Sequence, residues 1–389
     1  MQQAVLTKTF DSKFLTAVSI VVGTSVGAGM LGLPVETARS GFFPTICLFF
    51  MTWLITISTG FLFADVLLSR PRGSNYISLG KNILGNTFKP LIFGFYILLF
   101  YSLIAAYTKA IGLILSKDLG LVNTSWAGSC YFILAFLPLM GFGTHLIGRV
   151  NGLLTSILLI SFVLLIAAGA GGISWSFLTH QNWPTSLFSL PLIISSFGFH
   201  GTLPSLVDYL DRDRKKIQSA IVIGSTITLV IYLAWEFFIL GSIPLTGEVS
   251  LTAAWMNDQT AISPMSHLSG NANVWMLAHI FSLTAIITSF FGVSIGLIDF
   301  LLDAFQCQRN LSTKMALLGA IYISTLLLSM TELRVFYLSL NYGAGVAGIF
   351  LLVFLPALLA YKTTEQRKVF PLIFFFCAVS LASCVLSFF

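Results

Sequence analysis

Long apolar runs recur along the whole chain, and they constrain its fold more than any other feature. Of the 389 residues, 57% are hydrophobic and only 9% are charged, whereas soluble domains carry about 25% charged residues. A membrane-spanning helix needs about 20 mostly apolar residues, and no strand-like alternation recurs, which disfavours a β-barrel. We therefore expect an all-α integral membrane protein with a single transmembrane domain over residues 1–389. The runs predict eleven transmembrane helices, at residues 14–35, 41–68, 88–115, 127–147, 151–170, 187–208, 217–240, 273–303, 313–330, 337–360 and 370–388.

Lysine and arginine are distributed unevenly between the loops that join these runs. With a cytoplasmic N-terminus, 16 of the 20 basic residues fall in inner segments, and only Arg39, Lys109, Lys117 and Arg334 fall outside. Cytoplasmic loops carry such an excess of basic residues. We therefore expect a cytoplasmic N-terminus and a periplasmic C-terminus. The net charge of +6 is scattered over short loops, so it does not indicate a nucleic-acid partner.

The first apolar run is interrupted in its middle. Residues 23–34 read Gly-Thr-Ser-Val-Gly-Ala-Gly-Met-Leu-Gly-Leu-Pro, and glycine disfavours a helix by about 1 kcal/mol relative to alanine, proline by about 3 kcal/mol. Broken backbone at membrane depth persists only where protein or a water-lined cavity satisfies its polar groups. The break therefore predicts a binding site. The alternative is close helix packing, because Gly23 and Gly27 also form a GxxxG pair.

A second break interrupts the sixth run, where residues 191–204 contain Gly198, Gly201 and Pro204. The first run opens spans 1–5 and the sixth opens spans 6–10, in opposite directions across the membrane. Interrupted segments at corresponding places in two halves indicate an inverted-repeat transporter. We expect one repeat over residues 14–170, an inverted repeat over residues 187–360 and an extra helix over residues 370–388.

Three stretches carry a resemblance to a known family. Residues 23–34, followed by Gly41-Phe-Phe-Pro44, resemble the first-helix signature of the amino acid–polyamine–organocation superfamily. Together with residues 196–204 and 288–299, they make the chain resemble the bacterial aromatic amino acid permeases of the hydroxy/aromatic amino acid permease family. The resemblance implies a LeuT-like fold of five plus five inverted helices with broken helices 1 and 6. It implies a secondary active transporter that imports an aromatic amino acid, first of all tyrosine, by proton symport across the bacterial inner membrane, without a cofactor.

The resemblance also implies where a zwitterionic amino acid would bind. Helix N-termini favour its carboxylate, and unwound carbonyls and hydroxyls accept hydrogen bonds from its ammonium group. Phe197 and Phe199 could stack on an aromatic side chain, or they could be core residues among 36 phenylalanines. Tyr101 and Tyr107 are further candidates in the third run. The substrate-binding residues implied are Thr24, Ser25, Gly27, Ala28, Gly29, Tyr101, Ser196, Phe197, Gly198, Phe199 and His200.

The coupling ion has two candidate sites. A histidine ordinarily titrates near neutral pH, so His200 could carry a proton, or it could be a neutral structural residue. Thr288 and Ser289 resemble the hydroxyl pair that helps bind sodium in sodium-coupled relatives, or they could bond to their own backbone. Asp299 and Asp303, four residues apart, could pair with loop arginines or relay protons. We expect protons, with Na⁺ at Thr288 and Ser289 as the alternative.

Other ionisable residues in the apolar runs are expected near helix ends. We expect Asp65 and Asp208 to be solvated or paired with loops, and Lys109 to extend to the membrane surface. Glu236 is a candidate gate residue or a structural one.

Several functions remain open on the same scaffold. A sodium-coupled transporter, or a permease for tryptophan, serine, threonine or a branched-chain amino acid, would show the same breaks. An enzyme would need a catalytic motif, and neither HExxH nor GxxxxGK[ST] occurs in the sequence, so we expect no enzymatic activity and no bound metal. Paired breaks disfavour a channel. One such bundle suffices for transport, so we expect a monomer whose partners are the amino acid and the lipid bilayer.

Overall fold

The computed structural model describes residues 12–141, 144–268, 270–308, 310–331, 333–363 and 370–386. These residues form helices joined by short connections, and they contain no strand, so the all-α fold is confirmed for them. The longest helices are α4 (Phe42–Leu68), α6 (Phe88–Leu113), α8 (Thr144–Gly169), α13 (Arg214–Ser242), α16 (Ala272–Ala304) and α17 (Leu311–Ser329).

Membrane crossings can be assigned by length and composition. Among the described residues, eight helices are long and apolar enough to cross, and the bent pair α2 (Ser12–Ser25) and α3 (Gly29–Thr37) adds a ninth span. Two further apolar helices, α7 (Ser125–Gly141) and α21 (Phe370–Leu386), have 17 residues each, the lower limit for a span. All eleven expected ranges overlap these helices, although residues 142–143 and 387–388 lie outside the described part. The count of eleven crossings stays a prediction.

Shorter helices complete the chain and include both halves of the second break. The sixth run is divided into α11 (Leu190–Ser196), η4 (His200–Thr202) and α12 (Leu203–Tyr209). The other short helices are α5 (Tyr76–Leu84), η1 (Ile114–Asp118), η2 (Ala170–Gly172), α9 (Trp175–Leu178), α10 (Trp183–Ser186), η3 (Leu187–Ser189), α14 (Leu251–Met256) and α15 (Ile262–Leu268).

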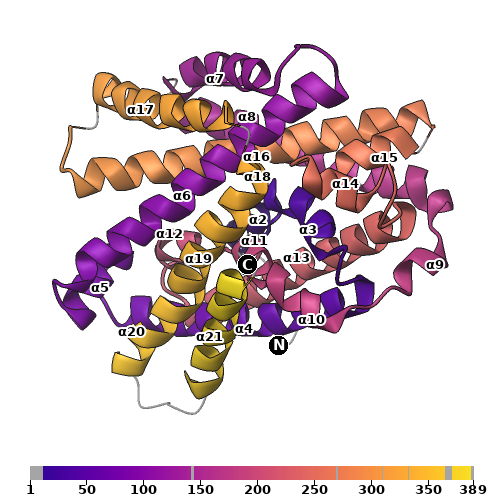
Figure 1. Ribbon diagram of the computed structural model, residues 1–389. Helices are drawn as coiled ribbons and strands as arrows, with labels where there is room; N and C mark the ends of the chain where they lie inside the picture. The colour runs from indigo at the N-terminus through magenta and orange to yellow at the C-terminus, as the bar shows by residue number, and fades with distance from the viewer. Residues whose placement is uncertain are drawn as a thin grey trace.

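The broken helices lie in the middle of the bundle. Figure 1 shows α2, α3 and α11 at its centre, where α2 and α3 pack against α13, and α11 packs against α3 and α4. Glycine permits part of this close packing, because a Cβ atom at Gly224 of α13 would lie 2.6 Å from Cβ of Val21 on α2. The fold therefore buries both breaks in protein, as non-helical backbone at membrane depth requires.

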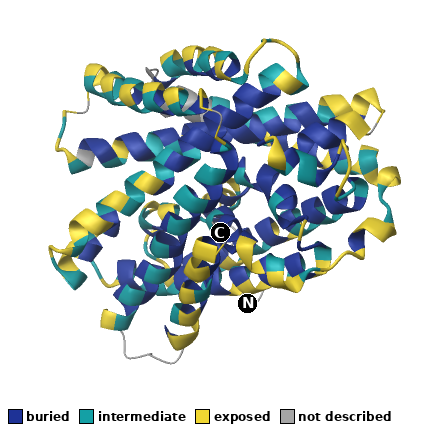
Figure 2. Cartoon of the chain, in the orientation of Figure 1, coloured by how far each residue is buried: buried dark blue, intermediate teal, exposed yellow. Residues whose placement is uncertain are grey.

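The outside of the bundle is apolar. Leu153, Ile160 and Val163 of α8 are 61% to 64% exposed, and their spacing places them on one stripe of the helix. Figure 2 shows further exposed faces on α7, α17 and α21. Contiguous exposed apolar surface of this kind marks contact with a membrane. The helices therefore form a multi-pass membrane protein.

The last long span is irregular. It combines α18 (Val335–Leu338), η5 (Ser339–Ala344), α19 (Gly345–Gly348), η6 (Ile349–Phe354) and α20 (Leu355–Thr363), of which η5 and η6 are π-helical. A Cβ atom at Gly345 would lie 2.6 Å from Cβ of Pro191, so glycine lets this span approach α11. π-helical turns are rare and often occur at functional sites.

Candidate functional site

The first break separates α2 from α3 with a bend of 50°. The Ala28 amide donates a hydrogen bond to Ser289 Oγ of α16 at 3.1 Å, instead of to a carbonyl of its own helix. A Cβ atom at Gly27 would overlap the same Ser289 oxygen. Glycine is therefore required here by close approach as well as by backbone freedom, and Ser289 satisfies one amide that the break leaves free.

The second break is equally tight. α11 ends at Ser196, and a Cβ atom at Gly198 would lie 2.8 Å from the carbonyl oxygen of Ser195 and 2.9 Å from Cδ1 of Leu352. The chain resumes its helix at Leu203, with Pro204 in the first turn, where proline lacks no hydrogen bond because that amide would be unpaired anyway.

The two breaks meet at one tyrosine. The Tyr232 hydroxyl of α13 lies 2.7 Å from the carbonyl oxygen of Ser25 and 2.8 Å from that of Ser196, the last residues of α2 and α11. One hydroxyl hydrogen serves both acceptors. Tyr232 therefore joins the ends of the two half-helices, which lie far apart in the sequence.

Unpaired hydroxyls also gather at this junction. Ser25 Oγ and Ser196 Oγ are buried and have no hydrogen-bond partner among the described residues, and Ser196 Oγ lies 3.3 Å from where a Cβ atom at Gly29 would be. A buried polar group without a partner is unfavourable by about 1–3 kcal/mol. Ser25 and Ser196 therefore leave two hydroxyls at the helix breaks without a protein partner among the described residues.

The aromatic residues of the second break point into the protein core. Phe197 and Phe199 are fully buried. The Phe197 ring packs edge-to-face with Tyr232 at a centroid distance of 5.0 Å, and the Phe199 ring stacks on His200 at 4.5 Å. In this structure both rings are occupied by protein neighbours.

The tyrosines of α6 differ in position. Tyr101 is half-buried, whereas Tyr107 is 5% exposed and its hydroxyl lies beside the Ser289 side chain. Tyr107 is therefore the one that the structure brings to the first break.

The remaining predicted residues are dispersed. Thr24 is exposed, and its hydroxyl donates to the carbonyl of Ile20. Thr288 donates to the carbonyl of Thr284 in its own helix at 2.8 Å. Asp299 is exposed and follows Ser289 by ten residues, about 15 Å along α16. The Asp303 side chain lies outside the described residues.

His200 is buried behind the second break. Its side chain is 0% exposed, and its Nε2 atom lies 2.9 Å from Thr59 Oγ1 of α4. The hydroxyl of Thr59 also contacts the carbonyl of Ile55 at 3.0 Å. This contact joins the imidazole of η4 to α4, away from solvent.

Two residues of the site, Tyr232 and Trp235, were not anticipated from the sequence, whereas Glu236 was expected as a gate or structural residue. Tyr232 and Trp235 of α13 hold the broken helices, the latter by donating from Nε1 to the carbonyl of Met30 at 2.9 Å. Glu236, one residue further, is fully buried and accepts a hydrogen bond from Thr37 Oγ1 at 3.0 Å. The available signal was that Tyr232 and Trp235 lie three residues apart, next to Glu236, inside one apolar run, where polar side-chain atoms are rare without a reason.

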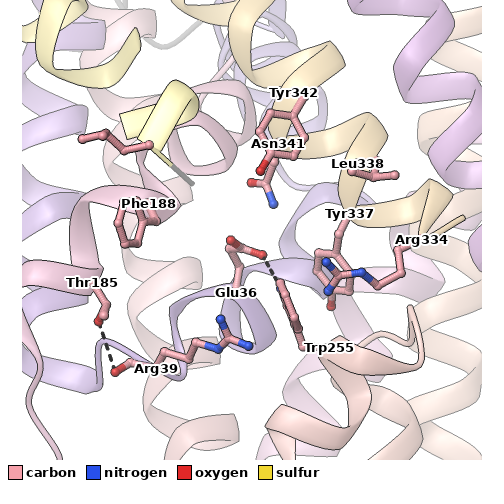
Figure 3. Close-up of a pocket in the computed structure, with 11 residues that line it drawn as sticks. Glu36, Arg39, Thr185, Phe188, Trp255, Arg334, Tyr337, Leu338, Asn341 and Tyr342 are labelled. Carbon is pink, nitrogen blue, oxygen red and sulfur yellow. Dashed lines mark hydrogen bonds between the residues drawn. The ribbon is translucent and has the colours of Figure 1, made fainter. Parts of the chain in front are cut away.

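A cavity of about 340 Å³ lies near the far end of α3. We call it the Trp255 pocket and define it by Glu36, Arg39, Trp255, Arg334, Tyr337 and Asn341. Figure 3 shows the two guanidinium groups on opposite sides of the Trp255 ring, with carbon Cζ of Arg39 4.0 Å and that of Arg334 3.6 Å from its centroid. Trp255 Nε1 donates to Glu36 Oε2 at 3.1 Å.

Asp258 fixes the backbone of Phe336 and Tyr337, the latter of which lines the Trp255 pocket. Its carboxylate is 5% exposed and accepts the amides of Phe336 at 3.0 Å and Tyr337 at 3.1 Å. Burial raises the pKa of Asp258 to about 6, although these hydrogen bonds and the charges of Lys109 and Arg334 act to lower it.

Lys109 does not extend to the membrane surface, so that prediction was wrong. It is 7% exposed and donates to the carbonyl of Ser329 at 3.0 Å. A buried carbonyl acceptor satisfies the ammonium group within the protein.

The opposite end of the bundle carries charged pairs. Arg214 donates through Nε and Nη2 to the two oxygens of Asp65 at 2.7 and 2.6 Å. Arg212 binds Asp208 at 3.3 Å and donates to the carbonyl of Leu68 at 2.7 Å. Asp65 and Asp208 were expected to be solvated or paired with loops; Asp208 pairs with Arg212 of the connecting loop, and Asp65 pairs with Arg214, the first residue of α13. We call this end the basic face, which includes Lys13, Asp65, Asp208, Asp211, Arg212 and Arg214.

Comparison with known proteins places the chain among transporters. The family described as "Tryptophan/tyrosine permease family" matches residues 11–386. The "Tryptophan-specific transport protein" of Pseudomonas aeruginosa is 30% identical over 359 residues, covering 89% of this chain and 85% of the relative. The "Tyrosine-specific transport system 1" of Haemophilus influenzae is 28% identical over 367 residues, covering 92% and 90%.

A solved structure shares the fold. A mutant of the Eremococcus coleocola manganese transporter aligns with a TM-score of 0.60 at 14% identity, covering 95% of this chain and 85% of that one. At this identity the likeness concerns the fold alone.

Proposed function

Because this chain belongs to the tryptophan/tyrosine permease family, we propose that it imports tyrosine or tryptophan by proton symport across the bacterial inner membrane. The observation that carries the proposal is the junction of the two breaks, where Ser25 Oγ and Ser196 Oγ lack partners among the described residues and Tyr232 joins both helix ends. Substrate binding there would act on both half-helices together.

The substrate backbone is proposed to bind between the breaks. The positive end of the α3 helix dipole favours its carboxylate. The carbonyls of Ser25 and Ser196 share a single donor in Tyr232, so each has lone pairs left for the ammonium group. The Tyr107 hydroxyl lies beside the same region. The rings of Phe197 and Phe199 would have to turn from their present contacts to reach an aromatic side chain.

Two substrates are candidates for different reasons. The family resemblance implied tyrosine first, whereas the Pseudomonas aeruginosa relative is a tryptophan-specific transport protein and a 29% identical relative from Escherichia coli is a "Low affinity tryptophan permease". Competition in one uptake assay separates them, since the preferred substrate inhibits at the lower concentration.

The proposed topology follows the basic residues. A cytoplasmic N-terminus puts the basic face inside and the Trp255 pocket outside. The two breaks then belong to the LeuT-like inverted repeats over residues 14–170 and 187–360, and transport proceeds by rocking of the core helices in a monomer.

Proton coupling is proposed to involve His200. Its contact with Thr59 links the second break to α4, so a change of charge on the ring would alter the packing between them. Sodium is the second candidate, because Ser289 Oγ is an oxygen at the first break. Thr288 Oγ1 donates to its own helix and keeps its lone pairs as ligands.

The test is uptake of radiolabelled tyrosine and tryptophan into proteoliposomes under an imposed proton or sodium gradient. Accumulation driven by protons supports the proposal. Accumulation driven only by sodium moves the coupling site to Thr288 and Ser289, and absence of aromatic uptake under both gradients refutes the function.

Matched variants test the site itself. Ser196→Ala removes an unpaired hydroxyl, and Ser195→Ala removes its neighbour, which already donates to the carbonyl of Leu192 at 2.9 Å. We expect the apparent KM to rise about tenfold in Ser196→Ala, as for one lost hydrogen bond of about 1.4 kcal/mol, and to change little in Ser195→Ala. Equal effects of the two variants would contradict the placement of the substrate.

A further inference from the structure

The Trp255 pocket is lined by charged and aromatic residues that take no part in the two central breaks. We propose that it is a second binding site, which holds the zwitterionic aromatic amino acid before it reaches the breaks. The identity of the ligand rests on the proposed function, whereas the existence of the site rests on the geometry of the pocket.

The pocket lies between one end of the bundle and the central breaks, on the path of a substrate that enters from that end. Glu36 follows Gly29 by seven residues on α3, about 10 Å along the helix. The layer beneath is closed, because the Ala261 amide donates to the carbonyl of Leu31 at 3.2 Å and a Cβ atom at Gly32 would lie 3.1 Å from Cε1 of Phe336. A molecule that arrives from this end of the bundle therefore meets the pocket first.

Two residues that line the pocket carry buried hydrogen-bonding atoms without a partner among the described residues. These atoms are Nη1 of Arg334 and Oδ1 of Asn341. Asn341 is 91% buried, since its exposed fraction is 9%, and Figure 3 shows its side chain pointing toward Glu36. One free donor on a cation and one free acceptor beside a carboxylate match the two ends of a zwitterion.

The charges also fit an amino acid. Arg39 and Arg334 carry two positive charges, and Glu36 is the one acidic residue among those that line the pocket. The carboxylate of the ligand would accept from Arg334, and its ammonium group would donate to Asn341 Oδ1 and Glu36. Pairing of the ligand carboxylate offsets the excess positive charge, so a ligand without a carboxylate would bind poorly.

The other residues that line the pocket suit the aromatic ring of the ligand. Phe188, Tyr337 and Leu338 contribute apolar surface, and the volume of about 340 Å³ falls in the range of small-molecule sites, roughly 300–1,000 Å³. Asn341 belongs to the π-helical turn η5, so the irregular winding of this span sets the direction of the one amide in the pocket.

Equilibrium dialysis of the purified full chain in nanodiscs, with radiolabelled tryptophan and tyrosine, tests the proposal. We expect two molecules bound per wild-type chain. We expect one in Arg334→Gln and one in Arg39→Gln, the latter being an exposed residue whose replacement should leave the fold intact. Arg72→Gln, an exposed arginine beside the basic face, is the matched control and should keep two.

Two further measurements separate the outcomes. Ser196→Ala should weaken binding at the central breaks and leave binding at the Trp255 pocket unchanged. Tryptamine, which lacks a carboxylate, should fail to compete at the Trp255 pocket. One molecule per wild-type chain, with normal proton-driven uptake, overturns this inference and leaves the proposed function intact. Two molecules in both arginine variants overturn it as well. Absence of aromatic uptake and binding overturns the proposed function itself.

Discussion

The two ends of the bundle are both closed by charged residues, but in different surroundings. On the basic face, Lys13 and Asp211 form a 2.9 Å ion pair with side chains 52% and 68% exposed. Near the Trp255 pocket, the carboxylate of Asp258 is 5% exposed and accepts two backbone amides. Exposed pairs contribute about 0–1 kcal/mol and are screened by salt, whereas a buried acceptor that is removed leaves its donors unpaired. We therefore expect substitutions near the Trp255 pocket to lower the free energy of unfolding more than substitutions on the basic face.

The largest expected effect is the loss of stability in Asp258→Ala. Two buried amides at the start of α18 lose their acceptor, so we expect the free energy of unfolding to fall by about 3 kcal/mol. Asp213 is the matched control, since its exposed carboxylate also accepts two amides at a helix start, those of Lys215 and Lys216 at 3.0 and 3.2 Å. Asp213→Ala should lose only about 1 kcal/mol. Denaturant titration in detergent measures both, and equal losses would mean that the two ends do not differ.

The second-largest expected effect is a pH dependence of the free energy of unfolding, which Asp258 near the Trp255 pocket produces. The pKa of Asp258 is raised to about 6 in the folded protein from 3.8, so the folded state binds the proton more tightly. This contribution to stability is fully present below pH 3.8 and is lost as the pH rises through about 6. Between pH 5 and pH 7 it should amount to about 1.3 kcal/mol. Asp258→Asn, which does not titrate, should remove that part of the pH profile, and an unchanged profile would show that other groups produce it.

Contacts between distant segments were harder to predict from the sequence than the helix breaks. Glycine and proline interrupt a helix whatever surrounds them, so both breaks could be predicted from residues 23–34 and 191–204. Tyr232 could not, because a tyrosine in an apolar run has the same local pattern whether it faces lipid or joins two helix ends. Its acceptor at Ser25 is 207 positions away. Trp255 and Asp258 lie in a long connection that the sequence marked only as an outer loop.

The direction in which side chains point was the second feature that could not be predicted from the sequence. Ser195 and Ser196 are adjacent and identical, yet one hydroxyl bonds to its own helix and the other is unpaired. Burial of the Lys109 ammonium beside the carbonyl of Ser329 depends on where α17 ends. Such facts come from packing between distant segments, which one sequence does not display.

A smaller effect is expected on the basic face for Arg214→Ala. The guanidinium makes two hydrogen bonds to Asp65, but the Arg214 side chain is 62% exposed. We expect a loss of about 0.5 kcal/mol at low salt. A double-mutant cycle with Asp65→Ala, repeated in 1 M salt where the Debye length is about 3 Å, should show the coupling disappear. Coupling that persists in high salt would place this pair in the same class as the buried groups near the Trp255 pocket.

The smallest effect is expected at Lys13 and Asp211, and its sign is the informative part. The hydrogen bond and charge of Lys13 lower the pKa of Asp211 below 3.8. This pair therefore contributes stability above pH 3.8 and loses it as the pH falls further, the opposite of Asp258. Asp211→Asn should flatten the unfolding profile slightly below pH 5 and leave it unchanged between pH 5 and pH 7. A change between pH 5 and pH 7 would mean that the two ends are coupled through the bundle, because Asp211 itself does not titrate there.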